Sequence, residues 1–319
     1  MSPKQQHVLA IDLGATNVRA ALVSSRGTIV RKIQRGTDRS GKDGAAVTAQ
    51  IIEMVEGLLR AARAERDDRA SIAGIGISSI GPLDYLRGGP TSSPNVPYSF
   101  ISLVKPLEKR FRLPVTFLND ANAAVIGEQR FGAGKGIKNL VYITISTGIG
   151  GGAIVDNKLL FGRSGNAAEV GHLVVDTAYN LPCTCGKGAG HWEGYASGRN
   201  IPRFFHAWLA EKKQNAPFQY QEAKDIFLHA RKQDPAALVF LDELARVNAR
   251  AISSVIVAYD PELITLGGSV ALGNSRALIG GVEKYADRYL PLPKIKITSL
   301  GEDISLLGAA AAVFAGDRD

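Results

Sequence analysis

Cysteine is scarce in this chain, whose 319 residues contain two, Cys183 and Cys185. Two cysteines separated by a single residue form no disulfide framework, which indicates a reducing compartment. Long hydrophobic runs are missing too, since none reaches the ~18 residues that a membrane-spanning helix needs. Nothing before Asp12 has the pattern of a signal peptide. The sequence therefore predicts a cytoplasmic protein without a membrane partner.

Blocks of like charge are also absent, although the formal net charge is +8. The basic residues are scattered and often stand beside acids, as in residues 63–69. This mixture is typical of a solvated surface rather than a basic binding stripe, so we expect no nucleic-acid partner. With 45% hydrophobic and 21% charged residues, the composition is that of a globular protein with one large or two ordinary domains.

Two common nucleotide-binding motifs are missing. The phosphate loop GxxxxGK[ST] does not occur, and the first predicted strand is followed by DLGATN instead of GxGxxG. The chain is therefore neither a Walker-type nucleotide-binding protein nor a dinucleotide-binding oxidoreductase. If it binds phosphates, backbone turns and a metal ion must neutralise their charge.

What is present is a small-residue turn between two apolar runs at the start of the chain. Residues 8–11 and 18–23 predict strands, and Gly14, Ala15 and Thr16 lie between them. Small residues let backbone N–H groups approach an anion closely, and Asp12 suits a hydrated Mg²⁺. The alternative is an ordinary hairpin with an exposed aspartate.

The same arrangement recurs in the second half. Residues 140–146 form the strongest strand signal and lead into a turn over residues 147–152, followed by a strand at 153–155. Two such turns favour a duplicated fold that holds phosphates between its halves. The alternative is that the glycines only allow close strand packing. A third glycine turn, Gly267-Gly268, follows a predicted strand at 263–266.

The order of the remaining predicted elements is typical of an α/β protein. Strands are expected at 28–34, 72–78, 115–118 and 295–298, and helices at 43–65, 103–111, 121–130, 236–259 and 304–314. Asn119 and Asp120 follow a strand and precede a helix, where open α/β sheets bind ligands. Asp120 could instead only cap that helix. We expect a small domain of residues 1–119 plus 303–319 and a large domain of residues 120–302.

The ordered set DLGATN, SPN, LNDANAA, STGIGGG, GNAAEVGH, CTCGKGAGHWE and ITLGGS resembles the ROK family (repressor, open reading frame, kinase). The resemblance covers nearly the whole chain and is nearest to the ATP-dependent glucokinase and hexokinase branch. It implies a two-lobed actin-like ATPase (ribonuclease H-like) fold, each lobe a mixed sheet with flanking helices. It also implies a kinase of glycolysis that uses ATP and Mg²⁺ to phosphorylate a hexose, most simply glucose at the 6-hydroxyl.

The resemblance implies roles for individual residues. Asp120 would be the catalytic base, and the sugar would be bound by Asn95, Asn119, Asp120, Glu169, His172 and Glu193. Asp12 would lie near Mg²⁺, through water, and the nucleotide would be bound by Asp12, Gly14, Ala15, Thr16, Asn17, Thr147, Gly148, Gly267 and Gly268.

Family members often carry a zinc site made by one histidine and three cysteines. Here His172, Cys183 and Cys185 match, while His191 stands in place of the third cysteine with one extra residue in the loop. Zn²⁺ accepts both ligand types, so a structural His₂Cys₂ site is one interpretation. A metal-free loop with His191 near Trp192 is the other.

Three alternatives stay open at this level. The sugar could be N-acetylmannosamine, N-acetylglucosamine or fructose instead of glucose. The chain could be a non-catalytic sugar-sensing regulator, although only seven residues precede Val8, too few for the added DNA-binding domain of family repressors. Family members are commonly dimers or tetramers, so a homo-oligomer is expected.

Overall fold

The computed structural model describes residues 6–41, 43–64, 71–91, 97–213 and 220–316. Its internal contacts divide the chain into two units. Unit 1 comprises Met1–Gly136, Phe161–Ala167 and Asp303–Asp319, and unit 2 comprises Ile137–Leu160 and Ala168–Glu302. The boundary differs from the expected one at residue 119, because the helix that follows it packs on the C-terminal helix and groups with unit 1.

Unit 1 contains a five-stranded sheet in which the last three strands of the spatial order run parallel to one another. The order is β3 (Ile29–Gly36), β2 (Asn17–Ser24), β1 (Gln6–Leu13), β4 (Ser71–Ser79) and β7 (Val115–Asn119). β1 pairs antiparallel with β2 and parallel with β4, and β4 pairs parallel with β7. β1 is buried along nearly its whole length, as expected of an apolar strand covered on both faces. A short hairpin of β5 (Leu83–Asp84) and β6 (Gly89–Pro90) follows β4.

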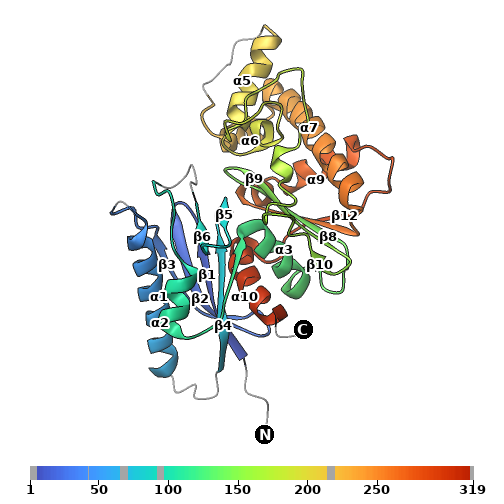
Figure 1. Ribbon diagram of the computed structural model, residues 1–319. Helices are drawn as coiled ribbons and strands as arrows, with labels where there is room; N and C mark the ends of the chain where they lie inside the picture. Colours follow the sequence, from blue (N-terminus) through green and yellow to red (C-terminus); the bar gives the residue numbers. More distant parts are fainter. Residues whose placement is uncertain (1–5, 42, 65–70, 92–96, 214–219, 317–319) are drawn as a thin grey trace. The chain divides into compact units, whose positions relative to one another are not determined.

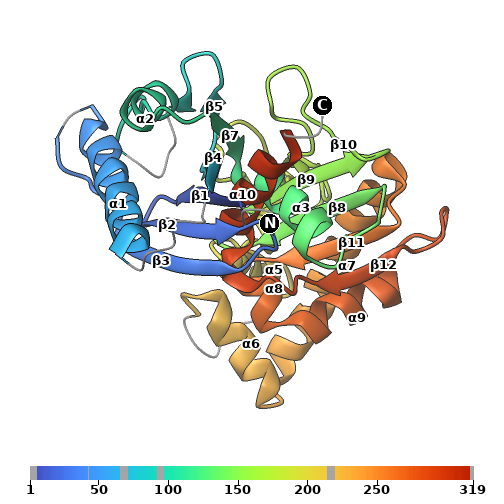
Figure 2. The same cartoon turned by 90° about the horizontal axis from the view of Figure 1, so that it is seen from below.

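Helices cover both faces of this sheet. In Figures 1 and 2, α1 (Ala45–Ala64) and α2 (Val104–Phe111) lie on one side, and α10 (Ile304–Gly316) lies on the other. α10 contacts β1, β4 and α3 (Asp120–Phe131). Small residues permit this packing, since a Cβ on Gly308 would lie 1.9 Å from the carbonyl oxygen of Ala123. The prediction of a buried C-terminal helix is confirmed.

Unit 2 repeats the sheet topology of unit 1. Its order is β10 (Lys158–Leu159), β9 (Ile149–Val155), β8 (Leu140–Ile145), β11 (Leu263–Gly267) and β12 (Lys294–Ile297). Again the first pairs are antiparallel, and β8, β11 and β12 are parallel. The predicted duplication is therefore present in the topology of the two sheets.

Helices make up most of the rest of unit 2 (Figure 1). They are α4 (Glu193–Ala196), α5 (Ile201–Glu211), α6 (Ala223–Arg231), α7 (Pro235–Tyr259), α8 (Ser269–Gly273) and α9 (Ser275–Tyr285). Fully buried aromatic side chains fill the core between them: Trp192, Tyr195, Phe204, Phe205 and Phe240. The indole N–H of Trp192 donates to Asn248 on α7 at 2.8 Å, which fixes the chain just before Glu193.

One predicted turn is shorter than expected. The turn over residues 147–152 ends at Gly148, and the glycines 150–152 belong to β9. A Cβ on Gly151 would lie 2.7 Å from the carbonyl oxygen of Ala168, so close packing, not turn geometry, requires a glycine there. In the part of the chain that the structure describes, no helix combines the length and apolarity needed to cross a bilayer.

Candidate active site

The strand register of unit 1 brings Asp12 and Asn119 to the same edge of the sheet. Asp12 pairs with Ser78 across β1 and β4, and Ser79 pairs with Asn119 across β4 and β7. These strands are parallel, so their carboxyl ends meet at one edge, where ligands bind in open α/β sheets. Asp120 comes directly after Asn119 and begins α3.

Asp12 is held from two sides and is only 8% exposed. Its Oδ2 accepts from Arg19 Nε at 3.0 Å and Nη2 at 2.6 Å, and its Oδ1 accepts from Ser78 Oγ at 3.1 Å. Arg19 is the cross-strand partner of Asp12 in the hairpin and also pairs with Asp303 at 3.3 Å. The interpretation of Asp12 as an exposed hairpin residue is therefore wrong.

The carbonyl groups of the first turn are all engaged. The oxygen of Gly14 accepts from Thr37 Oγ1 at 2.8 Å, that of Ala15 from Arg39 Nη2 at 3.0 Å, and that of Thr16 from the Thr37 amide at 2.9 Å. The carbonyl oxygens of these three residues are therefore already hydrogen-bonded, which weakens their repulsion of an approaching anion. Thr16 and Asn17 are exposed at its tip.

Asn119, rather than Asp120, caps α3. The Oδ1 of Asn119 accepts from the Asn122 amide at 2.9 Å, which satisfies one of the amides left unpaired at a helix start. Asp120 is the first helical residue, and its Oδ1 accepts from the Ala121 amide at 2.8 Å. The alternative that Asp120 only caps this helix is therefore wrong, and its side chain is half-buried.

The two glycine turns of unit 2 lie at the carboxyl ends of neighbouring parallel strands. Gly267 at the end of β11 pairs with Thr144 of β8, just before Thr147 and Gly148. The hydroxyl groups of Ser146 and Ser269 lie 3.3 Å apart and link the two turns. Gly268 has φ +84°, a conformation that favours glycine, and it precedes the short helix α8.

Glu193 reaches the first of these turns from α4. Its Oε2 accepts from the Ile149 amide at 3.0 Å, and its Oε1 accepts from Thr184 Oγ1 at 2.7 Å. Glu169 precedes a 3₁₀ turn over Val170–His172. Burial, and then the negative charge of Glu193, raise the pKa of the Glu169 carboxyl. The alternative that Glu169 is a freely exposed acid is wrong, because the residue is partly buried.

The four predicted metal ligands come together. The ligand atoms of His172, Cys183, Cys185 and His191 all lie within 4.8 Å of one another. The two histidine Nδ1 atoms are 3.4 Å apart, and each faces one sulfur, at 3.9 Å for His172–Cys183 and 3.7 Å for His191–Cys185. A tetrahedral zinc ion with ordinary bond lengths would place such atoms about 3.3–3.8 Å apart.

The surroundings of the two sulfur atoms also suit a metal. The backbone amides of Cys185 and Lys187 each donate to a cysteine sulfur at 3.5 Å, a contact that favours thiolate. Without a metal, burial raises the pKa of the Cys183 thiol to about 11 and, together with the charge of His172, lowers the pKa of His191. The donor set of two sulfurs and two imidazoles fits Zn²⁺, which binds thiolate and neutral imidazole, and a bound metal would offset the effect of burial by stabilising the thiolate.

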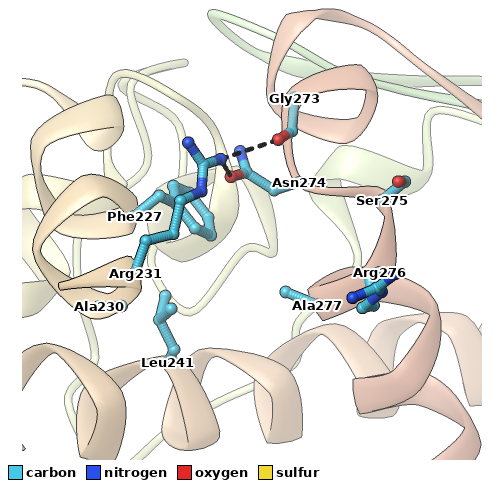
Figure 3. A pocket seen from close by; sticks show the side chains of 9 residues that line it. All are labelled: Phe227, Ala230, Arg231, Leu241, Gly273, Asn274, Ser275, Arg276 and Ala277. Carbon is cyan, nitrogen blue, oxygen red and sulfur yellow. Dashed lines mark hydrogen bonds between the residues drawn. The ribbon is translucent and has the colours of Figure 1, made fainter. Parts of the chain in front are cut away.

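A cavity of about 570 Å³ lies beyond α8 in unit 2 (Figure 3). Its lining includes Phe227, Arg231 and Leu241 on one side and Asn274 and Ala277 on the other. Arg231 Nη2 donates to the Gly273 oxygen at 3.0 Å and to Asn274 Oδ1 at 2.9 Å, and Asn274 Nδ2 donates to Val270. The polar groups of Arg231 and Asn274 are thus already paired, while Ser275 and Arg276 also line the cavity.

Sequence analysis missed two side chains of this region and one predicted residue cannot be placed. Arg19 could have been found from its spacing, since a four-residue turn puts positions 12 and 19 opposite each other. Thr184 gave no signal, because its partner Glu193 is specified only by the folded loop. Asn95 lies outside the described residues.

The chain is similar to known proteins along nearly its whole length. The model of the ROK family matches residues 8–315. A glucokinase of Aeropyrum pernix is 37% identical over 98% of this chain and 98% of its own, and an N-acetylmannosamine kinase of Haemophilus influenzae is 30% identical over 95% and 93%.

Two solved structures are similar along nearly the whole chain. The ROK hexokinase of Thermus thermophilus has a TM-score of 0.80 at 30% identity, covering 98% of this chain and 99% of its own. A ROK family glucokinase of Streptomyces griseus, in complex with glucose and AMPPNP, has a TM-score of 0.76 at 30% identity, covering 97% and 100%. These likenesses confirm the predicted actin-like ATPase fold class.

Proposed function

Because the chain belongs to the ROK family, we propose that it is an ATP-dependent hexokinase that phosphorylates glucose at the 6-hydroxyl, with Asp120 as general base. The observation that carries the proposal is the register of β1, β4 and β7, which puts Asp12 and Asn119-Asp120 at one sheet edge. Phosphoryl transfer needs a carboxylate to accept the proton of the attacking hydroxyl and a positive charge on the phosphates. Asp120 would supply the first, and Mg²⁺ held through water by Asp12 the second.

The sugar is uncharged and offers only hydroxyl groups, so its recognition needs strong acceptors and donors. In this proposal those are Asn119, Asp120, Glu169, His172 and Glu193, with Asn95 as a further ligand. The hydrogen bonds of Glu193 with the Ile149 amide and with Thr184 Oγ1 support this assignment, because together they hold the carboxylate in one orientation.

The triphosphate of ATP would lie against the turns Gly14–Asn17 and Thr147–Gly148. The engaged carbonyls of the first turn support this, since they remove acceptors that would repel an anion. Gly267 and Gly268 would flank the adenosine, and the cavity beyond α8 is the place that we propose for the base. Because Arg231 and Asn274 are already paired, apolar contact would hold the base there.

We also propose a structural Zn²⁺ bound by His172 Nδ1, Cys183, Cys185 and His191 Nδ1. It would stiffen the loop that carries these ligands and leave Nε2 of His172 for a sugar hydroxyl. Protein purified without chelator should contain close to one equivalent of zinc by elemental analysis. Less than a tenth of an equivalent would contradict this assignment.

A kinase for another sugar is the second candidate, since the chain is also 30% identical to an N-acetylmannosamine kinase. A coupled ADP-release assay over a panel of hexoses and amino sugars separates the two, and glucose should give the highest kcat/KM. We further propose a cytoplasmic homo-oligomer, dimer or tetramer, that binds neither nucleic acid nor membrane. Light scattering after size exclusion tests the oligomeric state.

The test of the mechanism is Asp120→Asn. Loss of the base should lower kcat by about 10²–10⁴-fold while part of the glucose affinity survives. Asp156→Asn, a matched change at an exposed position, should leave kcat unchanged. Retention of more than a few percent of kcat by Asp120→Asn would remove Asp120 as the base.

A further inference from the structure

Thr184 lies between the two cysteines of the metal loop, residues 183–191, and its side chain points to Glu193 rather than to a metal ligand. Its Oγ1 donates to Glu193 Oε1 at 2.7 Å. The other carboxylate oxygen, Oε2, accepts from the Ile149 amide at 3.0 Å. Each oxygen of Glu193 therefore has a short hydrogen bond, one from the metal loop and one from the turn between β8 and β9. Cys183 Sγ lies farther from Oε1, at 3.9 Å, and as a metal-bound thiolate it would have no proton to donate.

The carboxylate also lies directly against that turn. A Cβ added to Gly148 would be 2.7 Å from Glu193 Oε2, closer than two such atoms can approach. The absence of a side chain at Gly148 thus leaves space for Glu193 Oε2, and Thr184 contacts the other carboxylate oxygen, Oε1. This contact joins the turn assigned to phosphate with a residue assigned to sugar.

The backbone beneath Glu193 is fixed mainly by residues other than Thr184. Asn200, which is 2% exposed, donates through Nδ2 to the Glu193 carbonyl oxygen at 2.9 Å and to Ser197 Oγ at 3.0 Å. Its contact with Thr184 Oγ1 is longer, at 3.5 Å. The buried indole of Trp192 is bonded to α7. When the Thr184 hydroxyl is removed, Asn200 keeps its two shorter hydrogen bonds. We therefore expect the end of the Glu193 side chain to be freed while its backbone stays in place.

We propose that Thr184 is a positioning residue for sugar binding, which fixes the plane of the Glu193 carboxylate from the metal loop. A carboxylate with a single donor can rotate about its last torsion, and binding then costs the entropy of ordering it. The inference rests on the proposed function, because it takes Glu193 as a sugar ligand. It adds a route by which the metal loop sets sugar affinity without contacting the sugar.

The test compares Thr184→Val, which keeps the shape and removes the hydroxyl, with Thr184→Ser, which keeps the hydroxyl. Thr28→Val is the matched control, since Thr28 is exposed and its hydroxyl has no hydrogen bond within the described residues. Glucose affinity is measured by calorimetry without nucleotide, together with kcat, KM and zinc content. Thr184→Val should raise both the Kd and the KM for glucose about tenfold, with kcat within about twofold of the parent.

Three results together support the inference: weaker binding in Thr184→Val, restored binding in Thr184→Ser, and the same zinc content in all variants. An unchanged Kd in Thr184→Val overturns it and leaves the proposed function intact. A raised Kd accompanied by lower zinc content than the parent also overturns it, because the effect then comes from a damaged loop. A parent protein that binds no glucose would instead refute the proposed function itself, and this inference with it.

Discussion

Two turns occupy the same place in sheets of the same topology: the turn between β1 and β2, and the turn between β8 and β9. They differ in where the carboxylate beside the turn comes from. In unit 1 the carboxylate, Asp12, belongs to the strand itself and is paired with Arg19 on the opposite strand. In unit 2 it is Glu193, which arrives from α4 and accepts from the Ile149 amide. Asp12 is thus positioned by the local hairpin, whereas Glu193 is positioned by contacts between residues far apart in the sequence.

The difference suits two separate tasks. A carboxylate that is paired with a guanidinium and only 8% exposed keeps one orientation, as the proposed contact with a hydrated Mg²⁺ requires. A carboxylate held by one hydroxyl and one amide keeps its net negative charge and further lone pairs, as recognition of sugar hydroxyls requires. The two sheets thus have similar turns whose carboxylates are fixed by different neighbours, and in our proposal Asp12 serves Mg²⁺ and Glu193 serves the sugar.

The largest effect is expected from Asp12→Asn, which tests whether the carboxylate of the first turn acts on Mg²⁺ and not on glucose. This change should lower kcat by about 10²–10³-fold, because the charge that holds Mg²⁺ at the phosphates is lost, and should leave the Kd for glucose within about twofold. The measurement is kcat as a function of Mg²⁺, whose half-saturating concentration should rise. Asp303→Asn is the control, since it removes the other partner of Arg19 without touching the turn. A large change in glucose affinity would contradict the division of tasks.

A smaller effect is expected from Gly148→Ala in the second turn. The added Cβ would lie 2.7 Å from Glu193 Oε2 and displace the carboxylate, so the KM for glucose should rise about tenfold with a lesser change in kcat. Gly280→Ala is the matched control, because its Cβ would meet nothing within 4 Å on α9. That control should keep its KM and gain up to about 1 kcal/mol of stability from helix propensity. Equal KM values for both variants would show that Glu193 tolerates displacement.

The smallest effect concerns the carboxyl pair of unit 2. Burial and the charge of Glu193 raise the pKa of Glu169, so the folded state binds more protons than the unfolded state between the ordinary and the raised pKa. Stability contributed by Glu169 therefore falls as pH rises through that window. Glu169→Gln does not titrate, so its urea midpoint relative to the parent should increase across the window and then stay constant. A difference independent of pH would be inconsistent with the shift, and Glu108→Gln, at an exposed position, serves as control.

Much of the fold could be predicted because long apolar or periodic runs dominate its local signals. β1, β8, α7 and α10 were all expected within a few residues of their observed bounds. α5 was not expected, since Phe204, Phe205 and Trp208 have middling helix propensity and their helix forms by packing into the core of unit 2. β9 was expected to start late, because glycine disfavours strands and only its contact with Ala168 explains Gly151.

The site was predictable where neighbours in sequence are neighbours in space. Asp12, Asn119 and Asp120 could be predicted as site residues because they stand at the ends of predicted strands. The strand order then places them at the same edge of the sheet. The alternative that Asp120 caps α3 is wrong, because two adjacent polar residues can both cap a helix and the backbone at the end of β7 selects Asn119. The metal-ligand set came from a resemblance, and the closeness of the four ligand atoms in space supports that assignment.

α10 has a consequence for how the protein is made. It covers one face of the unit 1 sheet through contacts with β1 and β4, yet it is translated after all of unit 2. A nascent chain therefore carries an N-terminal sheet with an uncovered apolar face for most of its synthesis. We expect that interval to be when a chaperone that binds apolar segments has most access to this polypeptide.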